Sequence, residues 1–474
     1  MVDCLNTSQP NIIVFGDLML DVNLYGSTNK IANEAPTPVL NITSKKAKLG
    51  GCGNVLMNLE SLGCSNLFLF SMVGNDIYAD KIQKILGKHS NITPYLYLDD
   101  TYQTTVKTRG FANKTLMFRY DIEKYSSLRS SHITMILSQL ISVLDSHKIN
   151  SIVLSDYNKG FLKDLAQEVI RIANEYGVPT YVDPKVDYSK YVGCTVFKPN
   201  IKEIYDIFNL QYSFESLREI HETVRDKLGC QETLITLSEN GMSMLTSDTL
   251  LYEPAVKTEV NDVTGAGDIV LAIFAYYTKM EREKLIKLAT YIGTQSVKWV
   301  GTYLIRPRDI LEAHRAIHEN KLITVDKVKY ITSPIVFTNG CFDILHEGHL
   351  ALFKYCKSVR ESNGCVIVAL NSDESIKGLK GPSRPINKLD SRIAMLNEID
   401  AIDWIVVFTE DTPYKVLQEI RPDVLVKGGD YTVDSVIGRE FCRDVKIFDY
   451  MRGKSTTNII EKIQKNLNTS VSML

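Results

Sequence analysis

The sequence Asn261-Asp262-Val263-Thr264-Gly265-Ala266-Gly267-Asp268 runs directly into the apolar segment Ile269–Tyr277. The small residues Gly265, Ala266 and Gly267 let the backbone turn closely, so we expect their amides to point at one spot at the positive end of a following helix. Such a nest suits the charge that develops on a transferring phosphoryl group. Asp268, in the first turn, could accept a proton from an attacking hydroxyl. An ordinary loop with an acid at a helix start is the alternative.

Strand and helix patterns alternate on the N-terminal side of this stretch. A glycine turn at Gly50-Gly51-Cys52-Gly53-Asn54 precedes a helical pattern that stops at Gly63. Short apolar runs predict buried strands at Asn11–Phe15, Asn66–Val73, Ile152–Leu154, Thr180–Val182, Thr195–Phe197 and Thr233–Leu237. The alternation favours a doubly wound α/β sheet. The Thr- and Tyr-rich segment Tyr95–Tyr120 is the exception, and it predicts a hairpin outside the main sheet that could serve as a lid.

A second series of strands begins after a polar helical stretch at Arg308–Asn320. Strand patterns follow at Ile335–Thr338, Val366–Leu370, Trp404–Phe408, Val424–Val426 and Val445–Phe448, with a last helix near Thr457–Asn466. We therefore expect two α/β domains, residues 1–320 and residues 333–466, of which the second is smaller and Rossmann-like.

Composition and charge exclude several classes of protein. Apolar residues make up 44% of the 474 residues and charged residues 23%, which excludes disordered and collagen-like chains. Because 54 Lys and Arg balance 56 Asp and Glu, we expect no basic face for nucleic acid. No signal peptide or long apolar run is present, so we expect no membrane span. Nine scattered cysteines without a CxxC pair indicate free thiols, and together these features predict a cytoplasmic protein.

The first 300 residues resemble the ribokinase-like carbohydrate kinases. Residues 262–268 match the Asp-x-x-Gly-Ala-Gly-Asp signature of that family, and the glycine turn ending at Asn54 matches its sugar-binding turn. Further family segments follow in the right order, namely Gly16-Asp17-x-x-x-Asp21, Ser155-Asp156-Tyr157-x-Lys159-Gly160, Val182-Asp183-Pro184-Lys185, Lys198-Pro199-Asn200-x-x-Glu203 and Leu237-Ser238-Glu239-Asn240-Gly241.

This resemblance implies ATP-dependent phosphorylation of a sugar, with Asp268 as the catalytic base. It implies that the substrate is held by Asp17, Asp21, Gly50, Gly51, Asn54 and Arg109. Implied nucleotide contacts are Asn200, Ile201, Lys202, Glu203, Ser238, Gly241, Gly265, Ala266 and Gly267. Ser238 stands where Gly is commoner in the family, which leaves the adenosine contact there open. Magnesium is implied with ATP, a monovalent cation is allowed in the kinase domain, and a homodimer through that domain is implied.

Basic residues of the expected lid could hold the phosphate of a sugar phosphate. They are Lys107, Arg109, Lys114 and Arg119. A solvated face of the hairpin is the alternative for most of them.

A second chemical motif, Thr338-Asn-Gly-Cys-Phe-Asp-Ile-Leu-His-Glu-Gly-His349, follows a strand and opens a helix. His346 and His349 are three residues apart, so they project to the same side of a helical turn. There the ring nitrogens can donate to phosphate oxygens beside free backbone amides. Zinc is the rival ligand, but the spacing is not that of a HExxH helix and no third ligand with matching spacing is present. We expect no metal site made by protein groups alone.

Residues 334–466 resemble the HxGH nucleotidyltransferase superfamily, which joins a nucleotide to a phosphorylated small molecule and releases pyrophosphate. Other matching segments are Lys380-Gly381-Pro382-x-Arg384-Pro385-Ile386, Lys427-Gly428-Gly429-Asp430-Tyr431 and Gly453-Lys454-Ser455-Thr456-Thr457-Asn458. We assign the transition-state phosphates to His346 and His349, and the triphosphate and pyrophosphate to Lys380, Arg392, Ser455, Thr456 and Thr457. Because a substrate phosphate is already ionised near neutral pH, this site needs positioning and charge neutralisation, not a base.

The combination is similar to a bifunctional family of Gram-negative bacteria. That resemblance implies phosphorylation of D-glycero-D-manno-heptose 7-phosphate at its anomeric hydroxyl and, after a separate phosphatase, adenylyl transfer to heptose 1-phosphate. The product, ADP-heptose, feeds the lipopolysaccharide core. A fusion with a cytidylyltransferase for another sugar or polyol phosphate would keep every motif, and the choice of base cannot be read from these residues. A nucleotide sensor without activity is a third hypothesis, but Asp268 and both histidines are present.

Overall fold

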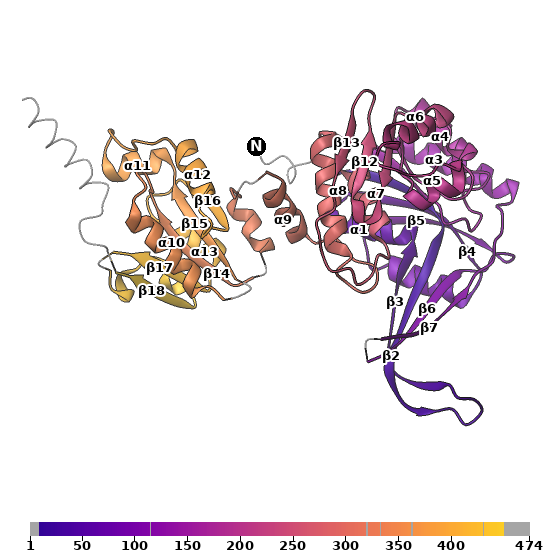
Figure 1. Ribbon diagram of the computed structural model, residues 1–474, viewed down its shortest axis with the longest axis horizontal. Coiled ribbons are helices and arrows are strands. Elements are labelled where there is room, and N and C mark those ends of the chain that lie inside the picture. The colour runs from indigo at the N-terminus through magenta and orange to yellow at the C-terminus, as the bar shows by residue number, and fades with distance from the viewer. Residues whose placement is uncertain are drawn as a thin grey trace, which may run out of the picture. The chain divides into compact units, whose positions relative to one another are not determined.

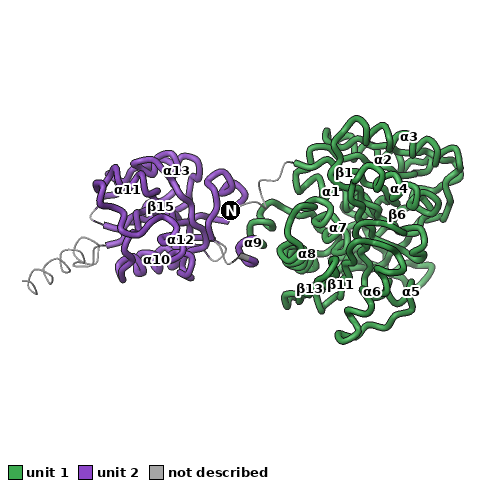
Figure 2. Tube along the Cα trace, turned by 90° about the horizontal axis from the view of Figure 1, so that it is seen from above, with its two compact units in different colours: residues 1, 3–313 green, residues 2, 314–474 purple. Residues whose placement is uncertain are grey.

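The computed structural model describes residues 9–113, 115–318, 321–331, 333–361, 364–429 and 431–449. The chain divides into two compact units at the bond between Ala313 and His314 (Figure 2). Each unit contains its own sheet.

The first unit is built on a nine-stranded sheet with the order β13-β12-β11-β10-β9-β8-β1-β4-β5 (Figure 1). Its strands are β1 (Asn11–Gly16), β4 (Asn66–Gly74), β5 (Ile92–Asp99), β8 (Ser151–Ser155), β9 (Thr180–Asp183), β10 (Val196–Phe197), β11 (Glu232–Thr236), β12 (Met242–Leu245) and β13 (Leu250–Glu253). The strands pair in parallel except at β12 and β13, which form an antiparallel edge. Central strands such as β8 are buried throughout because helices cover both faces.

Helices cover the two faces of this sheet in two groups. In one group, α7 (Ala266–Tyr276) lies in the middle and contacts both α1 (Cys52–Leu62) and α8 (Arg282–Ser296). The other face carries α3 (Ser130–Ser146), α4 (Ala166–Glu175), α5 (Ile201–Phe208) and α6 (Leu217–Leu228) (Figure 1). A further helix, α2 (Ile77–Leu86), packs against β4. Because α7 is buried from Asp268 to Tyr276, its first turn is held firmly beside the sheet.

A separate four-stranded sheet, with the order β3-β2-β6-β7, contains the segment expected to serve as a lid, and we call it the lid sheet. Its strands are β2 (Leu18–Ile31), β3 (Pro38–Gly51), β6 (Thr105–Ala112) and β7 (Thr115–Ile122). The expected hairpin is therefore present in β6 and β7, but the prediction was wrong for Tyr95–Asp99, which belongs to β5 of the main sheet. The pattern also missed β2 and β3, because much of β3 is polar and exposed and gives no apolar run.

The lid sheet has two unlike faces, because residues paired across strands point to the same side. Its basic face carries Asp21, Asn23, Lys46, Lys48, Lys107, Arg109, Arg119 and Asp121. Its apolar face carries Val22 together with Phe118 and Tyr120 of β7. The side chains of Phe118 and Tyr120 are 39% and 50% exposed, so this face is only partly covered within the chain.

The second unit is built on a five-stranded parallel sheet with the order β16-β15-β14-β17-β18. Its strands are β14 (Ile335–Gly340), β15 (Cys365–Asn371), β16 (Trp404–Phe408), β17 (Val424–Gly428) and β18 (Asp444–Phe448), and its helices are α10 (Glu347–Val359), α11 (Asp373–Lys380), α12 (Leu389–Asn397) and α13 (Tyr414–Ile420). This arrangement confirms the expected smaller Rossmann-like fold. The helix expected near Thr457–Asn466 lies outside the described residues.

Residues ahead of β14 belong to the second unit. The unit boundary falls within α9 (Pro307–His318), and Arg315 Nη1 of that helix lies 3.1 Å from Asp403 Oδ1. The amide of Ile405 donates to Lys321 O at 2.8 Å, and the amide of Ile323 donates to Ile405 O at 2.9 Å. The domain limits expected from the sequence, 1–320 and 333–466, stay a prediction.

The described chain contains eight cysteines, and each has a free thiol. Within the same residues, no helix combines the length and the apolar character needed to cross a bilayer.

A pair of fragments tests where the second unit begins. We expect residues 307–474 to be more stable than residues 333–474 by about 3 kcal/mol, because the shorter fragment loses the buried Ile323 and the backbone hydrogen bonds that Ile323 and Lys321 make to Ile405. Urea unfolding of the two fragments measures the difference. Equal unfolding free energies would show that residues 314–331 are only a linker.

Candidate active sites

The carboxyl ends of β1 and β8 meet where the strand order of the first sheet reverses, the usual place for a ligand in such folds. Asp17 follows β1 and is buried. Its carboxylate accepts the amides of Tyr157, Lys159 and Phe161 at 2.9, 3.0 and 3.4 Å. Burial, with a contribution from Asp156, raises the pKa of Asp17 to about 6, and the amides oppose that shift. The structure thus places Asp17 as an anchor for the loop after β8.

Asp268 lies buried in the first turn of α7, and both of its carboxylate oxygens accept a hydrogen bond. Asn54 Nδ2 donates to Oδ2 at 2.7 Å, and the Tyr157 hydroxyl donates to Oδ1 at 2.8 Å. Burial raises the pKa of Asp268, whereas these two donors and the charge of Lys198 lower it. Each oxygen keeps a lone pair, so an ionised Asp268 can still take a proton from a bound hydroxyl.

The expected glycines permit close approach around this carboxylate. Gly265 caps α7 with φ 84°, in the left-handed region, and a Cβ there would lie 2.6 Å from Asn54 Nδ2. Gly50 and Gly51 lie against Asp21 and Asp17, so the glycine turn brings two predicted substrate residues to the same place. One expected nest amide is already used, because the amide of Ala266 donates to Val263 O.

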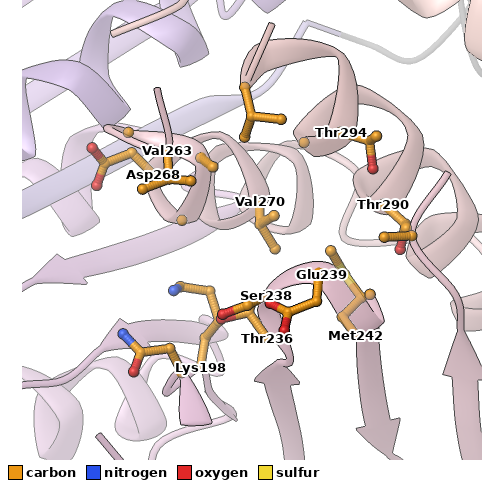
Figure 3. Close-up of a pocket in the computed structure, with 18 of the residues that line it drawn as sticks. Lys198, Thr236, Ser238, Glu239, Met242, Val263, Asp268, Val270, Thr290 and Thr294 are labelled. Carbon is orange, nitrogen blue, oxygen red and sulfur yellow. The ribbon is translucent and has the colours of Figure 1, made fainter. Parts of the chain in front are cut away.

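A cavity of about 770 Å³ opens beside Asp268, a size that suits a nucleotide. Figure 3 shows Asp268 and Lys198 toward one end and Thr290, Thr294 and Met242 toward the other. Of the residues expected to hold the nucleotide, the lining includes Asn200, Glu203, Ser238, Gly241, Gly265, Ala266 and Gly267.

Four charged side chains in this cavity form two pairs, Lys198 with Asp183 and Lys185 with Glu203. Lys198 Nζ is buried 3.1 Å from Asp183 Oδ1, and burial raises the pKa of Asp183 to about 7 while Lys198 opposes the rise. Asn200 and Glu203 form a capping box at the start of α5, and Lys185 pairs with Glu203. Ile201 and Lys202 continue the first turn of α5 without lining the cavity.

Ser238 has a backbone φ of 54°, the left-handed region that glycine adopts most easily. This conformation accounts for the glycine that is commoner at the matching position of the kinase family. A non-glycine residue held there costs on the order of 1 kcal/mol.

The basic face of the lid gathers cations around one carboxylate. Arg109 Nη1 lies 3.0 Å from Asp21 Oδ1, and Lys48 and Lys107 flank Asp21 across the sheet. Burial lowers the pKa of both lysines, and the charge of Asp21 opposes that shift. A second carboxylate, Asp121, pairs with Arg119 on the same face, and the remaining cations still leave a positive excess that suits an anionic substrate. Lys114 lies outside the described residues.

The second unit places His346 as the N-cap of α10 and His349 in its first turn. The two rings stack with centroids 3.7 Å apart, and Phe342 contacts His349 edge-on at 5.1 Å. Burial lowers the pKa of both rings; for His349, burial followed by His346 and Lys380 brings it to about 4. Each ring is therefore neutral at pH 7. Both Nδ1 atoms are buried and have no hydrogen-bond partner within the described part of the chain.

The structure places Arg392 differently from the expectation that it holds the triphosphate. Its side chain is fully buried, and the guanidinium donates to the carbonyls of Asn387, Cys341 and Asn371 and to Asp373. Arg392 therefore ties together the loops around the histidines, and a helix-start arginine in a sequence does not reveal such acceptors. Lys380, the last residue of α11, lies near enough to His349 to lower its pKa. Ser455, Thr456 and Thr457 lie outside the described residues.

Lys48 lies outside the motifs found in the sequence, and Tyr157, Asp343, Asn339 and Lys427 lie within matching motifs but had no predicted role. Tyr157 and Lys48 contact or flank predicted residues, and Asp343 binds the amides of Ile386 and Asn387 at 3.0 and 2.8 Å. Lys427 Nζ, at the end of β17, donates to Asn339 Oδ1 at 2.9 Å. Tyr157, Asn339 and Lys427 lie at or just beyond the carboxyl ends of parallel strands, and that position was the available signal.

Two protein-family descriptions match the chain. "pfkB family carbohydrate kinase" matches residues 9–308, and "Cytidylyltransferase-like" matches residues 337–463. Phosphofructokinase-2 of Escherichia coli, solved in complex with potassium, superposes on 66% of this chain and 100% of its own with a TM-score of 0.54 and 15% identity. Ribokinase of Arabidopsis thaliana, solved with ribose and ATP, covers 65% of this chain and 99% of its own with a TM-score of 0.50 and 14% identity. At these identities the likeness concerns the fold.

Fold, sites and family matches together define a bifunctional transferase, with an ATP-using carbohydrate kinase domain followed by a nucleotidyltransferase domain. "Bifunctional protein HldE" of Aliarcobacter butzleri is 37% identical over 97% of this chain and 98% of its own, and that of Campylobacter fetus is 39% identical over 96% and 99%. The chain belongs to the HldE family.

We expect Asp268→Asn to slow sugar phosphorylation by ~10²–10⁴, the usual effect of losing a general base. The fold should persist, because the Tyr157 hydroxyl can accept a hydrogen bond from the new amide. Steady-state kinase assays measure the loss, with nucleotidyl transfer by the same chain and an Asp226→Asn variant as controls. Unchanged turnover would remove Asp268 from the mechanism.

We expect His349→Ala to slow nucleotidyl transfer by ~10²–10³, as for one lost transition-state donor, with a much smaller effect on nucleotide binding. His349→Gln, which keeps an N–H donor, should retain part of the activity. Pyrophosphate release measures both variants, and kinase activity is the internal control. One tightly bound zinc per chain that disappears in the alanine variant would contradict a role at phosphate.

Proposed function

We propose that the chain phosphorylates D-glycero-D-manno-heptose 7-phosphate at its anomeric hydroxyl and transfers adenylate from ATP to heptose 1-phosphate. The observation that carries the kinase assignment is Asp268, buried between Asn54 and Tyr157 at the end of a cavity of nucleotide size. Membership of the HldE family supports the pairing of this kinase with a nucleotidyltransferase. The product, ADP-heptose, serves lipopolysaccharide core synthesis.

In the kinase domain, the substrate hydroxyl attacks the γ-phosphorus of ATP while Asp268 accepts its proton, and ADP leaves. The amides at the start of α7 stabilise charge on the transferring group. Asp21 and the glycine turn bind the sugar, and Lys48, Lys107 and Arg109 hold its 7-phosphate. The surplus of positive charge on the basic face around Asp21 supports placing the phosphate there.

Magnesium is part of this proposal as a companion of ATP. The described residues contain no cluster of three His, Cys, Asp or Glu side chains that could hold a metal, so the ion would rely on phosphate oxygens and single carboxylates. Glu203 lines the cavity, but its carboxylate already takes Lys185 and the amide of Asn200, so phosphate oxygens would supply most of the ligands and the bound ion would neutralise phosphate charge. We include a monovalent cation because the similarly folded phosphofructokinase-2 was solved with potassium.

In the second domain, an oxygen of heptose 1-phosphate attacks the α-phosphorus of ATP and pyrophosphate leaves. The substrate phosphate is already ionised, so no base is required. His346 and His349, neutral because burial lowers the pKa of each, donate to the phosphates in the transition state. Lys380 and the segment Ser455–Thr457 hold the triphosphate, while Arg392 keeps the surrounding loops in place.

The chain acts as a cytoplasmic homodimer in this proposal. Free thiols in the described chain support a reducing compartment, and the exposed Phe118 and Tyr120 of the lid's apolar face support pairing of two kinase domains. The mass of a fragment of residues 1–318 in solution tests the dimer. Twice the mass of that fragment would support a dimer, and a mass equal to that of one fragment would contradict it.

Assays of the full chain with a panel of substrates test the proposed reactions. We expect heptose 7-phosphate to give a kcat/KM at least ~10-fold above fructose 6-phosphate, and Lys48→Met to raise the KM for the phosphorylated sugar, because one cation is lost. For the second domain, ATP should support pyrophosphate release with heptose 1-phosphate. Preference for CTP, or for another sugar or polyol phosphate, would favour the related cytidylyltransferase fusion.

A further inference from the structure

Tyr157 is held at three points of the kinase site, although no step of the mechanism yet uses it. Its amide donates to the buried carboxylate of Asp17, and its hydroxyl donates to Asp268 Oδ1 at 2.8 Å. Its ring lies beneath Lys107 of the lid, with Nζ 5.6 Å from the ring centroid. A side chain fixed at its backbone, ring and hydroxyl presents that hydroxyl to Asp268 in one orientation.

Charged and titratable groups face Asp268 from each neighbouring element. They are Asp21 of β2, Cys52 of α1, Tyr157 after β8, Asp183 of β9 and Lys198 after β10. Asp21 and Asp183 disfavour the ionised form of Asp268, and Lys198 favours it. The pKa of Tyr157 is raised well above its usual value by burial and then by Asp268, so the hydroxyl remains a proton-bearing donor at working pH.

We propose that Tyr157 is a positioning residue for the kinase base, holding one oxygen of Asp268 in place and favouring its ionised form. The inference rests on the proposed role of Asp268. No proton leaves Tyr157 in this role, and the substrate proton still goes to the carboxylate. Because Asn54 holds the other oxygen, the carboxylate plane is set from two sides and its remaining lone pairs face fixed directions.

The pH dependence of the kinase reaction in Tyr157→Phe tests this role in the full chain. Loss of a donor to the charged form raises the pKa of Asp268, so the acid limb of kcat/KM should move up by about one to two pH units. At a pH below the acid limb of both proteins the rate should fall ~10-fold or more, and most of it should return on the alkaline plateau. Adenylyl transfer by the same chain should not change.

A matched control is Tyr176→Phe, which removes an exposed tyrosine hydroxyl that donates to Asp145 at 2.8 Å. It should leave the pH profile and both activities as they are. Site-specific 3-fluorotyrosine at position 157 keeps the ring and has a more acidic hydroxyl, so it should move the acid limb to lower pH. This second variant keeps the test decisive even where Tyr157→Phe folds poorly.

If the acid limb does not shift in either variant, the inference is wrong. A rise in KM for both substrates without that shift would not rescue the inference, because loosened packing alone would raise KM. This failure is distinct from failure of the proposed function. If Asp268→Asn abolishes phosphorylation but the limb does not move in the Tyr157 variants, Asp268 remains the base and only the role of Tyr157 is lost. If Asp268→Asn is active, both assignments fall.

Discussion

In the main sheet of each unit, polar groups meet between two parallel strands at the point where the strand order reverses, and a buried or half-buried side chain bridges them. Asp17 accepts amides of the loop after β8, and Lys427 donates to Asn339 at the end of β14. Polar groups buried there without partners would cost free energy, so each bridge holds the two strand ends in one arrangement. The loops that begin at these ends carry Tyr157 in one unit and the approach to His346 in the other. Both candidate sites therefore depend on these bridges.

The two sites differ in the charges that they bury, and the difference follows their chemistry. Around Asp268 lie Asp21 and Asp183, with Lys198 close to both Asp183 and Asp268. Burial raises the pKa of Asp268, and Asn54, Tyr157 and Lys198 oppose that rise, which favours the ionised form that a base for a neutral hydroxyl needs. Burial lowers the pKa of both His346 and His349. Glu347 opposes that shift at His346, whereas His346 and Lys380 add to it at His349. Neutral donors beside a cation suit an attack in which both reactants are already anions.

The sequence predicted the parts of the molecule that depend on local pattern. Apolar runs located the main strands, and the Gly265–Asp268 segment located the start of α7, because buried parallel strands and a glycine cap have strong local requirements. It did not reveal β2 and β3, whose partly exposed, polar residues give no such signal. The buried partners of Arg392 and the hydroxyl contact of Tyr157 come from segments distant in the chain. Contacts of that kind follow from topology, which a single sequence does not display.

The alternating side chains of the lid strands have a consequence for how this protein can change over evolution. Along β6, Lys107 and Arg109 point to the basic face and Thr108 lies between them on the apolar face. A substitution alters one position, but a single-residue deletion before Lys107 would turn every later side chain of the strand to the opposite side. The cations would then leave the side of the sheet that carries Asp21 and enter the apolar face. Lineages of this protein should thus accept length changes in the turn beyond β6 far more readily than within the strand itself.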